Sequence, residues 1–247
     1  MLQNKIVEGQ DNSIGKEPKS IHTWLDSDKS NLYNYDIDLC VVDFPSMPNT
    51  KWLYFFSLQV NFKNHNEWAH GGFQFADVEK FKSNQRKGVN WGGGSDWSGY
   101  GGLGTTNTPF TWELQKWYRY RVWRLPVDNK GFWHWEFWIL DYETGFDKQF
   151  GTIRTKSEFI NNACVWIETG YGVQCDTERA YVKWRNPIFR CLTQGLFSPN
   201  KGTATYNGTC EGANNTNQGL VSTDPLIWFQ TTNSPRTVNN YENLWGN

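Results

Sequence analysis

Apolar and polar residues alternate with a period of two along much of the chain, which is the spacing of a β-strand with one buried face. The alternation is sharpest over 117–125 and 132–141. Turn-forming residues separate several of these runs, and helical periodicity is weak throughout. Further strands are predicted at 36–44, 52–62, 70–76, 87–91, 147–154, 163–169, 179–186 and 226–231. The pattern therefore predicts a single all-β domain, an antiparallel β-sandwich of the jelly-roll or concanavalin-like type.

Three segments fall outside this alternation. Residues 1–30 are expected to form a polar N-terminal arm that precedes the sandwich domain at 31–247. Residues 88–109 are rich in Gly and predict a long loop, a feature that is often functional in compact domains. Residues 193–224 are rich in Gly, Asn and Thr and predict a second, soft surface loop.

Tryptophan is the residue type that bears most directly on function, since 15 of the 247 residues are Trp and many lie inside the predicted strands. In the strand at 132–141, one face is wholly apolar, while His134 and Glu136 share the other face with Trp138. Flat rings stack on the apolar face of a sugar, and polar groups between them bond its hydroxyls. This strand therefore favours a lectin-like, carbohydrate-binding function.

The strand at 117–125 is expected to lie beside this one. Either its odd residues, from Trp117 to Trp123, or its even residues, from Tyr118 to Arg124, then join the face of His134 and Glu136. The alternative is a purely structural role, in which Arg and Glu pair across an exposed sheet face. The predicted ligand-binding residues are Gln74, Trp91, Trp97, Tyr100, Arg119, Arg121, Trp123 and Trp138.

Two enzymatic alternatives use the same surface. Glu136 and Glu168, with His134, would suit a glycoside hydrolase if the carboxylates faced each other. A polysaccharide lyase would instead gather neutral and cationic groups around a uronate. Its residue set would be His70, Gln74, His134, Tyr181 and Lys183. A third alternative is a module that binds protein or a hydrophobic small molecule, because Trp, Tyr and Arg also dominate protein interfaces.

Charge and motifs narrow the class of protein. The net charge is −1 and no run of Lys or Arg occurs, so neither nucleic acid nor an anionic membrane is an expected partner. The apolar runs are too short for a transmembrane helix. No cofactor motif is present, and a Ca²⁺ site of loop oxygens stays open without a location. The oligomeric state is open as well.

Five cysteines bear on the compartment. Four of them, Cys164, Cys175, Cys191 and Cys210, lie in the C-terminal third without C-x-x-C spacing. One or two disulfides in an exported protein are expected, with Cys191 and Cys210 tying the soft loop and Cys40 left as a buried thiol; five unpaired thiols are the alternative. No charged and apolar leader opens the chain, so the protein is expected to be exported after removal of a signal peptide, or else cytosolic.

Several motifs resemble a family of secreted bacterial proteins with a β-rich domain of unassigned chemistry. They are W-Y-R-Y-R-V-W-R-L at 117–125, W-I-L-D at 138–141, T-G at 144–145, G-T-I-R at 151–154, G-G-F-Q-F at 71–75 and V-Q-C-D at 173–176. The resemblance covers roughly residues 50–190. It implies a concanavalin-like or jelly-roll sandwich and export, and it assigns no catalytic residue.

Overall fold

A computed structural model describes residues 18–45, 52–63, 66–77, 79–94, 106–171, 173, 178–208 and 216–246. Almost all of the regular structure is strand. The strands are β1 (Pro18–Asp26), β2 (Leu32–Asp43), β3 (Trp52–Phe62), β4 (Trp68–Ala76), β5 (Lys87–Gly94), β6 (Thr106–Pro109), β7 (Trp117–Leu125), β8 (Trp133–Asp141), β9 (Asp147–Thr155), β10 (Ile160–Tyr171), β11 (Tyr181–Cys191), β12 (Gly195–Phe197), β13 (Lys201–Gly208), β14 (Thr216–Thr223), β15 (Leu226–Thr232) and β16 (Asn243–Trp245). One short 3-10 helix, η1 (Glu79–Asn84), precedes β5.

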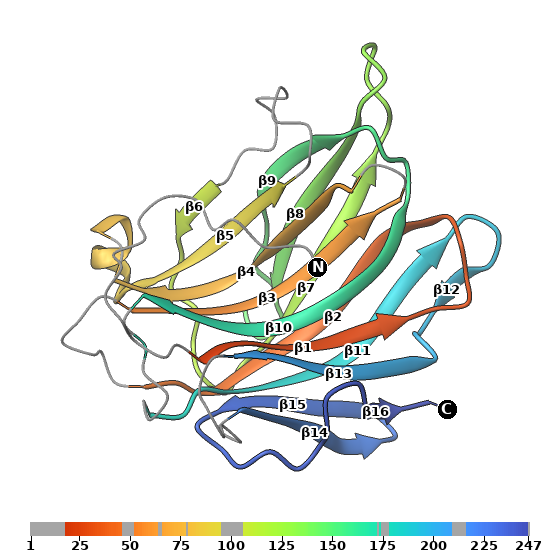
Figure 1. The fold of residues 1–247 in the computed structure, drawn as a ribbon. Coiled ribbons are helices and arrows are strands. Elements are labelled where there is room, and N and C mark those ends of the chain that lie inside the picture. Colours follow the sequence, from red (N-terminus) through yellow and green to blue (C-terminus); the bar gives the residue numbers. More distant parts are fainter. Residues whose placement is uncertain are drawn as a thin grey trace.

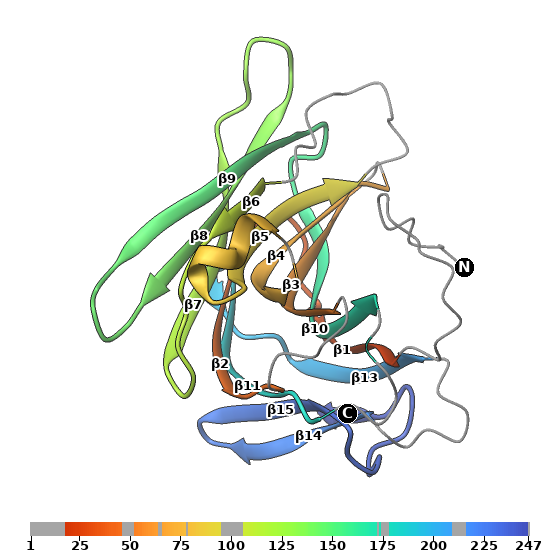
Figure 2. The same cartoon turned by 90° about the vertical axis from the view of Figure 1, so that its left-hand side faces the viewer.

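The strands form two antiparallel layers (Figures 1 and 2). The first layer has the order β14-β15-β11-β2-β7-β8-β9, with β12 beside β11. The second layer has the order β16-β13-β1-β10-β3-β4-β5-β6. The layers meet at one edge, where Ile160 of β10 pairs with Leu32 of β2. The predicted all-β sandwich is confirmed.

The core lies between the layers and is built from one face of each strand. In β7 the even residues Tyr118, Tyr120 and Val122 turn inward. In β10 the odd residues Ala163, Val165 and Ile167 turn inward, and their side chains are almost fully buried. Because successive side chains alternate between faces, the odd residues of β7 and the even residues of β10 lie on the two outer faces.

The hydroxyl of Tyr120 crosses the core to the opposite layer. It accepts a hydrogen bond from the backbone N of Phe73 at 2.8 Å and donates one to the carbonyl of Phe56 at 3.2 Å. Phe56 and Phe73 are register partners on β3 and β4, so the phenol stands at the pairing of these two strands. Burial raises the pKa of Tyr120 well above its usual value, which keeps the hydroxyl a donor.

A second polar group of the core ties β1 to the C-terminal strands. Thr23 donates to the side-chain oxygen of Gln218 at 2.6 Å and accepts from Trp228 at 3.1 Å and from Gln230 at 3.0 Å. All four side chains are completely buried. Buried polar groups that bond one another avoid the cost of desolvation, so this network fixes where β1 sits without weakening the core.

Three segments expected to be irregular contain strands. The predicted arm at 1–30 includes β1, which stands between β13 and β10 in the second layer. The predicted loop at 88–109 begins with β5 and ends with β6. The predicted soft loop at 193–224 contains β12, β13 and β14. Polar composition misled the prediction because each strand has a polar outer face.

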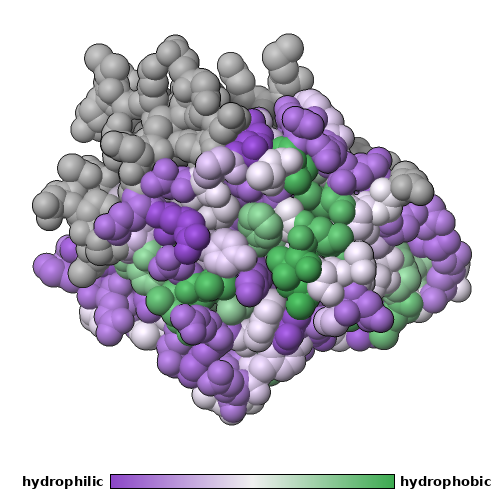
Figure 3. Space-filling view, turned by 90° about the horizontal axis from the view of Figure 1, so that it is seen from below, coloured by the Kyte–Doolittle hydropathy of each residue, from purple (hydrophilic) through white to green (hydrophobic). Residues whose placement is uncertain are grey.

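The free edge of the first layer carries exposed apolar side chains. Seen from below, apolar side chains gather over β14 and β15 (Figure 3). Leu220 and Val221 of β14 are 36% and 50% exposed there, at the free edge of the first layer. In the part of the chain that the structure describes, no helix is long and apolar enough to cross a membrane.

Tyr120→Phe is expected to lower the free energy of unfolding by about 1–3 kcal/mol, because it leaves a buried backbone donor and acceptor without their partner. Urea denaturation measures the change. Tyr35→Phe is the matched control, since the Tyr35 hydroxyl is equally buried and has no hydrogen-bond partner. A loss of stability in the control that equals the loss in Tyr120→Phe would contradict this account.

Candidate functional site

The molecule offers two outer sheet faces. We call the outer face of the first layer the arginine–tryptophan face, after Arg119, Arg121, Arg185 and Arg190 and the indoles of Trp117, Trp123 and Trp138. We call the outer face of the second layer the histidine face, after His22 and His70. The core separates them, so no side chain reaches from one face to the other.

Cation–π stacking dominates the arginine–tryptophan face. The guanidinium carbon of Arg185 lies 3.9 Å from the ring centre of Trp117. Arg190 lies 5.2 Å from Trp123 in the same way. A third pair, Arg121 with Trp138, is separated by 5.7 Å. The rings are therefore covered by guanidinium groups and are not free to stack on a ligand.

Asp38 anchors this face. Its carboxylate is fully buried and accepts hydrogen bonds from Arg119 Nε at 2.7 Å and Arg185 Nε at 3.3 Å. Tyr142 Oη and Asn186 Nδ2 donate to it at 2.9 and 2.8 Å. Four donors replace the water that the charge has lost, so the carboxylate joins β7 and β11 to β2.

Glu136 and His134 each bond other residues of the first layer. Glu136 accepts from Trp138 Nε1 at 2.9 Å and from Gln149 Nε2 at 2.8 Å. His134 Nε2 lies 3.1 Å from a carboxylate oxygen of Asp128. The backbone hydrogen bond from Phe132, then the His134 contact, hold the pKa of Asp128 at about 2. His134 and Asp128 close a hairpin, and Glu136 bonds an indole and an amide, not the Arg side chain that the structural alternative supposed.

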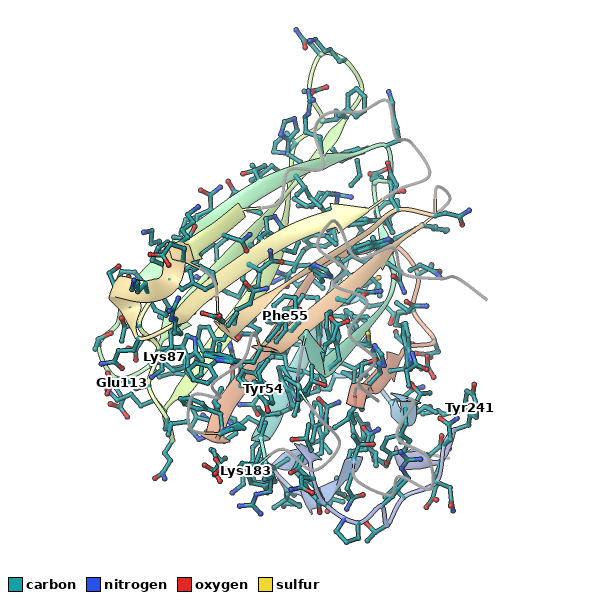
Figure 4. All side chains as sticks on the ribbon, turned by 60° about the vertical axis from the view of Figure 1, so that its left-hand side comes forward. Tyr54, Phe55, Lys87, Glu113, Lys183 and Tyr241 are labelled. Atoms are coloured by element: carbon teal, nitrogen blue, oxygen red, sulfur yellow. The ribbon has the colours of Figure 1, made fainter. Side chains whose placement is uncertain are left out.

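The structure does not bring the predicted catalytic sets together. Glu136 lies on the arginine–tryptophan face and Glu168 on the histidine face, so they face away from each other across the core. His70 and Gln74 share the histidine face, whereas His134, Tyr181 and Lys183 point out of the first layer. In Figure 4, Lys183 of the first layer lies below Phe55, which is on the histidine face of the second layer.

The other predicted ligand-binding residues divide in the same way. The odd residues of β7 do join Glu136, through Trp123 opposite Glu136 and Arg121 opposite Trp138. Trp91, a predicted ligand-binding residue, does not reach either outer face, because it is completely buried and stacks on Phe137 at 5.2 Å. Trp97 and Tyr100 lie outside the described residues.

Asp38→Ala is expected to cost about 3–5 kcal/mol of unfolding free energy, the scale for removing one partner from a buried ion pair and leaving charges unmatched. Chemical denaturation measures it. Glu136→Gln is the control, since its partially exposed partners are both neutral donors, and a change below about 1 kcal/mol is expected. Equal losses in the two variants would show that Asp38 is not the anchor of this face.

The histidine face is arranged in rows that cross the strands. One row is His22, Trp166, Ser57, Gly72 and Asn90, from β1 through β10, β3 and β4 to β5. Ser57 and Gly72 are the smallest residues in it. A side chain is excluded at Gly72, where an added Cβ would stand 2.0 Å from the Phe56 carbonyl. The middle of this row therefore has little side-chain volume.

Aromatic rings surround His70, which lies beside the row that contains Ser57 and Gly72. The imidazole centre lies 4.9 Å from Trp68, 5.3 Å from Phe55 and 5.5 Å from Trp166. On the other side of Trp166, His22 lies 5.9 Å from it and stacks on Trp24 at 6.0 Å. The face is thus a patch of rings with two imidazoles inside it.

Both imidazoles are neutral over most of the pH range. Burial lowers the pKa of His22 to about 4, and burial also lowers the pKa of His70 to about 4 although a hydrogen bond to Asn90 opposes it. A neutral imidazole keeps one donor and one acceptor nitrogen. The two groups are therefore hydrogen-bonding groups and not cations at neutral pH.

Side-chain amides border the rings. Gln59 Nε2 donates to Asn61 Oδ1 at 2.9 Å, and Asn61 Nδ2 donates to Asn162 Oδ1 at 2.7 Å. At the opposite edge of the layer, Asn90 Nδ2 of β5 donates to Asn107 Oδ1 of β6 at 3.0 Å. Amides carry both donors and acceptors, so this border matches a ligand that also has both, at regular intervals.

A carboxylate and an amide flank one ring in the next row. Glu168 of β10 is opposite Phe55 of β3, which is opposite Gln74 of β4. Two strand spacings place the α-carbons of Glu168 and Gln74 about 9–10 Å apart. Glu168 is the one carboxylate among the described outward residues of β10, β3, β4 and β5. Both side chains are half-buried.

The cysteines do not add a reactive group to this face. Cys164, in the row of Gln59 and His70, is completely buried, and burial raises its pKa. Cys40 and Cys191 are also free thiols, so the predicted pairing of Cys191 with Cys210 is wrong. Cys175 and Cys210 lie outside the described residues. Among the described residues, no group of three or more His, Cys, Asp and Glu side chains is placed to hold a metal ion.

Sequence analysis found Gln74 and Glu168 but assigned them to different functions, and it missed His22 and Trp24. A signal was present, because Ile21, Thr23 and Leu25 alternate with these two residues. The polar composition of the segment outweighed it.

The imidazoles predict a dependence of stability on pH. Their folded pKa of about 4 lies below the unfolded value of 6.5, so unfolded chains bind protons first as the pH falls. The free energy of unfolding should therefore drop between pH 6.5 and 4, by on the order of 2 kcal/mol for each imidazole at pH 5. Urea midpoints at pH 7 and 5 measure this, and a His22→Gln, His70→Gln double variant should flatten the profile. An unaltered slope would contradict it.

Comparison with known proteins identifies the fold. No protein-family model and no curated protein matches the sequence. A solved structure of scytalido-glutamic peptidase with a peptide-based transition state analog has a TM-score of 0.52 at 8% identity, covering 88% of this chain and 99% of the peptidase. A second, with a transition state analog inhibitor, has a TM-score of 0.50 at 10% identity, covering 89% of this chain and 100% of the peptidase.

The predicted carbohydrate-binding function is wrong. The solved structures that share the fold are peptidases with transition state analogs, not lectins. The strand that suggested a sugar site has its polar groups paired and its indole under a guanidinium. The polysaccharide hydrolase and lyase alternatives fail too, because neither residue set shares one face. The chain has the β-sandwich fold of these peptidase structures.

Proposed function

We propose that the histidine face binds an extended peptide and that Glu168 promotes hydrolysis of its backbone. The observation that carries the proposal is the row of Glu168, Phe55 and Gln74, a carboxylate and an amide on either side of an apolar ring. The peptidase structures of the same fold, one of them with a peptide-based transition state analog, support it.

The chemistry of the face suits a peptide. A peptide backbone offers a donor and an acceptor at every residue, and the amides of Gln59, Asn61 and Asn90 offer the complement. The rings around His70 suit apolar side chains of the same peptide. Because both imidazoles are neutral, the face does not require a charged substrate.

Glu168 and Gln74 divide the reaction between them. The Glu168 carboxylate takes a proton from a water molecule while the oxygen of that water attacks the peptide carbonyl carbon. The Gln74 amide donates a hydrogen bond to the carbonyl oxygen as it becomes negative. Glu168 then returns the proton to the departing amine, the C–N bond breaks, and a carboxylic acid and an amine are released. No cofactor takes part in these steps.

The resemblance to secreted bacterial proteins extends this proposal to the compartment. A peptide hydrolase that is exported would meet its substrates outside the cell.

Glu168→Gln is expected to lower the rate of hydrolysis of fluorescein-labelled casein by at least about 100-fold, the scale for removal of a general base. The exchange keeps the shape and the hydrogen-bonding capacity of the side chain, so binding of casein fragments should persist. Fluorescence release between pH 3 and 8 measures the rate, and fluorescence anisotropy measures the binding.

Glu136→Gln is the matched control, because Glu136 is on the opposite outer face, and it should keep activity within about twofold. If the wild-type chain binds casein fragments but releases no fluorescence at any pH, the hydrolysis is contradicted and only peptide binding stands. If neither binding nor release is seen, the whole proposal is contradicted.

A further inference from the structure

One donor on the histidine face has no acceptor. Trp166 is 4% exposed, and its indole N–H is buried without a hydrogen-bond partner. Indole is a donor only, and a buried donor left unmade costs about 1–3 kcal/mol. Six other described indoles are satisfied within the fold: Trp24 donates to Thr205, Trp112 to the Gln74 carbonyl, Trp135 to Thr155, Trp138 to Glu136, Trp184 to Gln230 and Trp228 to Thr23. The indoles of Trp123 and Trp245 are buried without a partner as well, but neither lies on the histidine face near Glu168.

The neighbours of Trp166 do not supply the missing acceptor. Phe55, at 5.0 Å between ring centres, is apolar. The two imidazoles lie at 5.5 and 5.9 Å between ring centres and make no hydrogen bond to the indole. Ser57, its partner in register, turns its hydroxyl to the backbone carbonyls of Leu58 and Gly71 at 2.8 and 2.9 Å.

The indole leans over the low part of the sheet. Its ring reaches both Phe55 of β3 and His70 of β4, although Trp166 itself is on β10. The space for this comes from Ser57 and Gly72, the two small residues next along its row. The ring of Trp166 therefore lies over the middle of the face, and its N–H is buried among the neighbouring rings.

Position along β10 relates this donor to the reaction. Trp166 and Glu168 are two residues apart on one strand and point to the same side, so they are about 7 Å apart along it. An extended peptide has the same repeat between every second residue. A peptide lying along β10 with one carbonyl at Trp166 therefore places the carbonyl two residues away at Glu168.

We propose that the indole N–H of Trp166 holds a backbone carbonyl of the bound peptide, two residues from the bond that faces Glu168. Trp166 is then a positioning residue that sets the register of the peptide, with the rings around it contacting an apolar side chain. This proposal rests on the proposed function, since it supposes that the face binds a peptide.

The experiment uses the full chain carrying Glu168→Gln, so that casein fragments are bound and not consumed. With the indole nitrogens labelled with ¹⁵N, NMR follows each indole N–H, and Trp166→Phe identifies the signal of Trp166 by its loss. On addition of casein fragments, the Trp166 signal should move downfield and exchange its proton with water at least about tenfold more slowly, as a new hydrogen bond requires.

Trp166→Phe keeps an aromatic ring but removes the donor. It should weaken binding of casein fragments about 5- to 30-fold, while Trp138→Phe, on the opposite outer face, should change binding less than about twofold. Near-ultraviolet circular dichroism and urea denaturation check that both variants keep the fold.

The outcomes separate the two proposals. If casein fragments bind but the Trp166 signal does not move, or Trp166→Phe binds as tightly as the parent, the positioning role is overturned and the peptide-binding face stands. If Trp138→Phe weakens binding as much as Trp166→Phe, the effect does not come from the histidine face and the role of the N–H is overturned. If casein fragments bind to no variant, both proposals are overturned.

Discussion

The Tyr120 hydroxyl is the contact on which the rest of the structure depends. It leaves the first layer and bonds the backbone of β3 and β4 at the pairing of Phe56 and Phe73. Inside a dry core, such a bond has no competing water and sets the relative position of the layers to within the length of a hydrogen bond. Gly72, next to Phe73, has the space of a hydrogen atom only. The bond therefore fixes the floor of the histidine face from below.

The polar groups of the two outer faces differ in their charge and in their partners. On the arginine–tryptophan face, charges are matched and rings are covered, as around Asp38 and Trp117. Three buried donors of this face, Arg121 Nε, Trp123 Nε1 and Arg190 Nε, also have no partner, so the faces differ in charge and not in the number of unmet donors. On the histidine face, the Trp166 donor has no acceptor and the imidazoles are held neutral by burial. Unmet hydrogen-bonding capacity in a patch of rings is what a binding surface retains.

The proposed function follows from that difference. The peptidase structures share the sandwich with this chain at 8% and 10% identity, so the fold is common to them and the chemistry must be argued from this chain's own residues. Here one carboxylate, Glu168, stands among amides and rings. That composition suits the recognition of a peptide backbone, with water activated by a single base.

Period-two alternation was enough to determine the sandwich, most of its strands and the faces of β7 and β8, because burial of one face leaves a pattern that any single strand carries. Alternation also separated Glu136 from its apolar neighbours. It did not tell an outer face of matched charges from one that binds, since Arg with Trp and His with Trp look alike within one strand.

That distinction was decided by register between strands distant in sequence. Trp123 meets Glu136 within a single hairpin, β7–β8, whereas Trp166 meets His22 across 144 positions of the chain and His70 across 96. A strand pairs with whatever buries its apolar face best, and that choice depends on the whole core. The sequence by itself therefore determined which residues of one strand share a face, and only the tertiary structure decided which face is buried and which residues of different strands stand together.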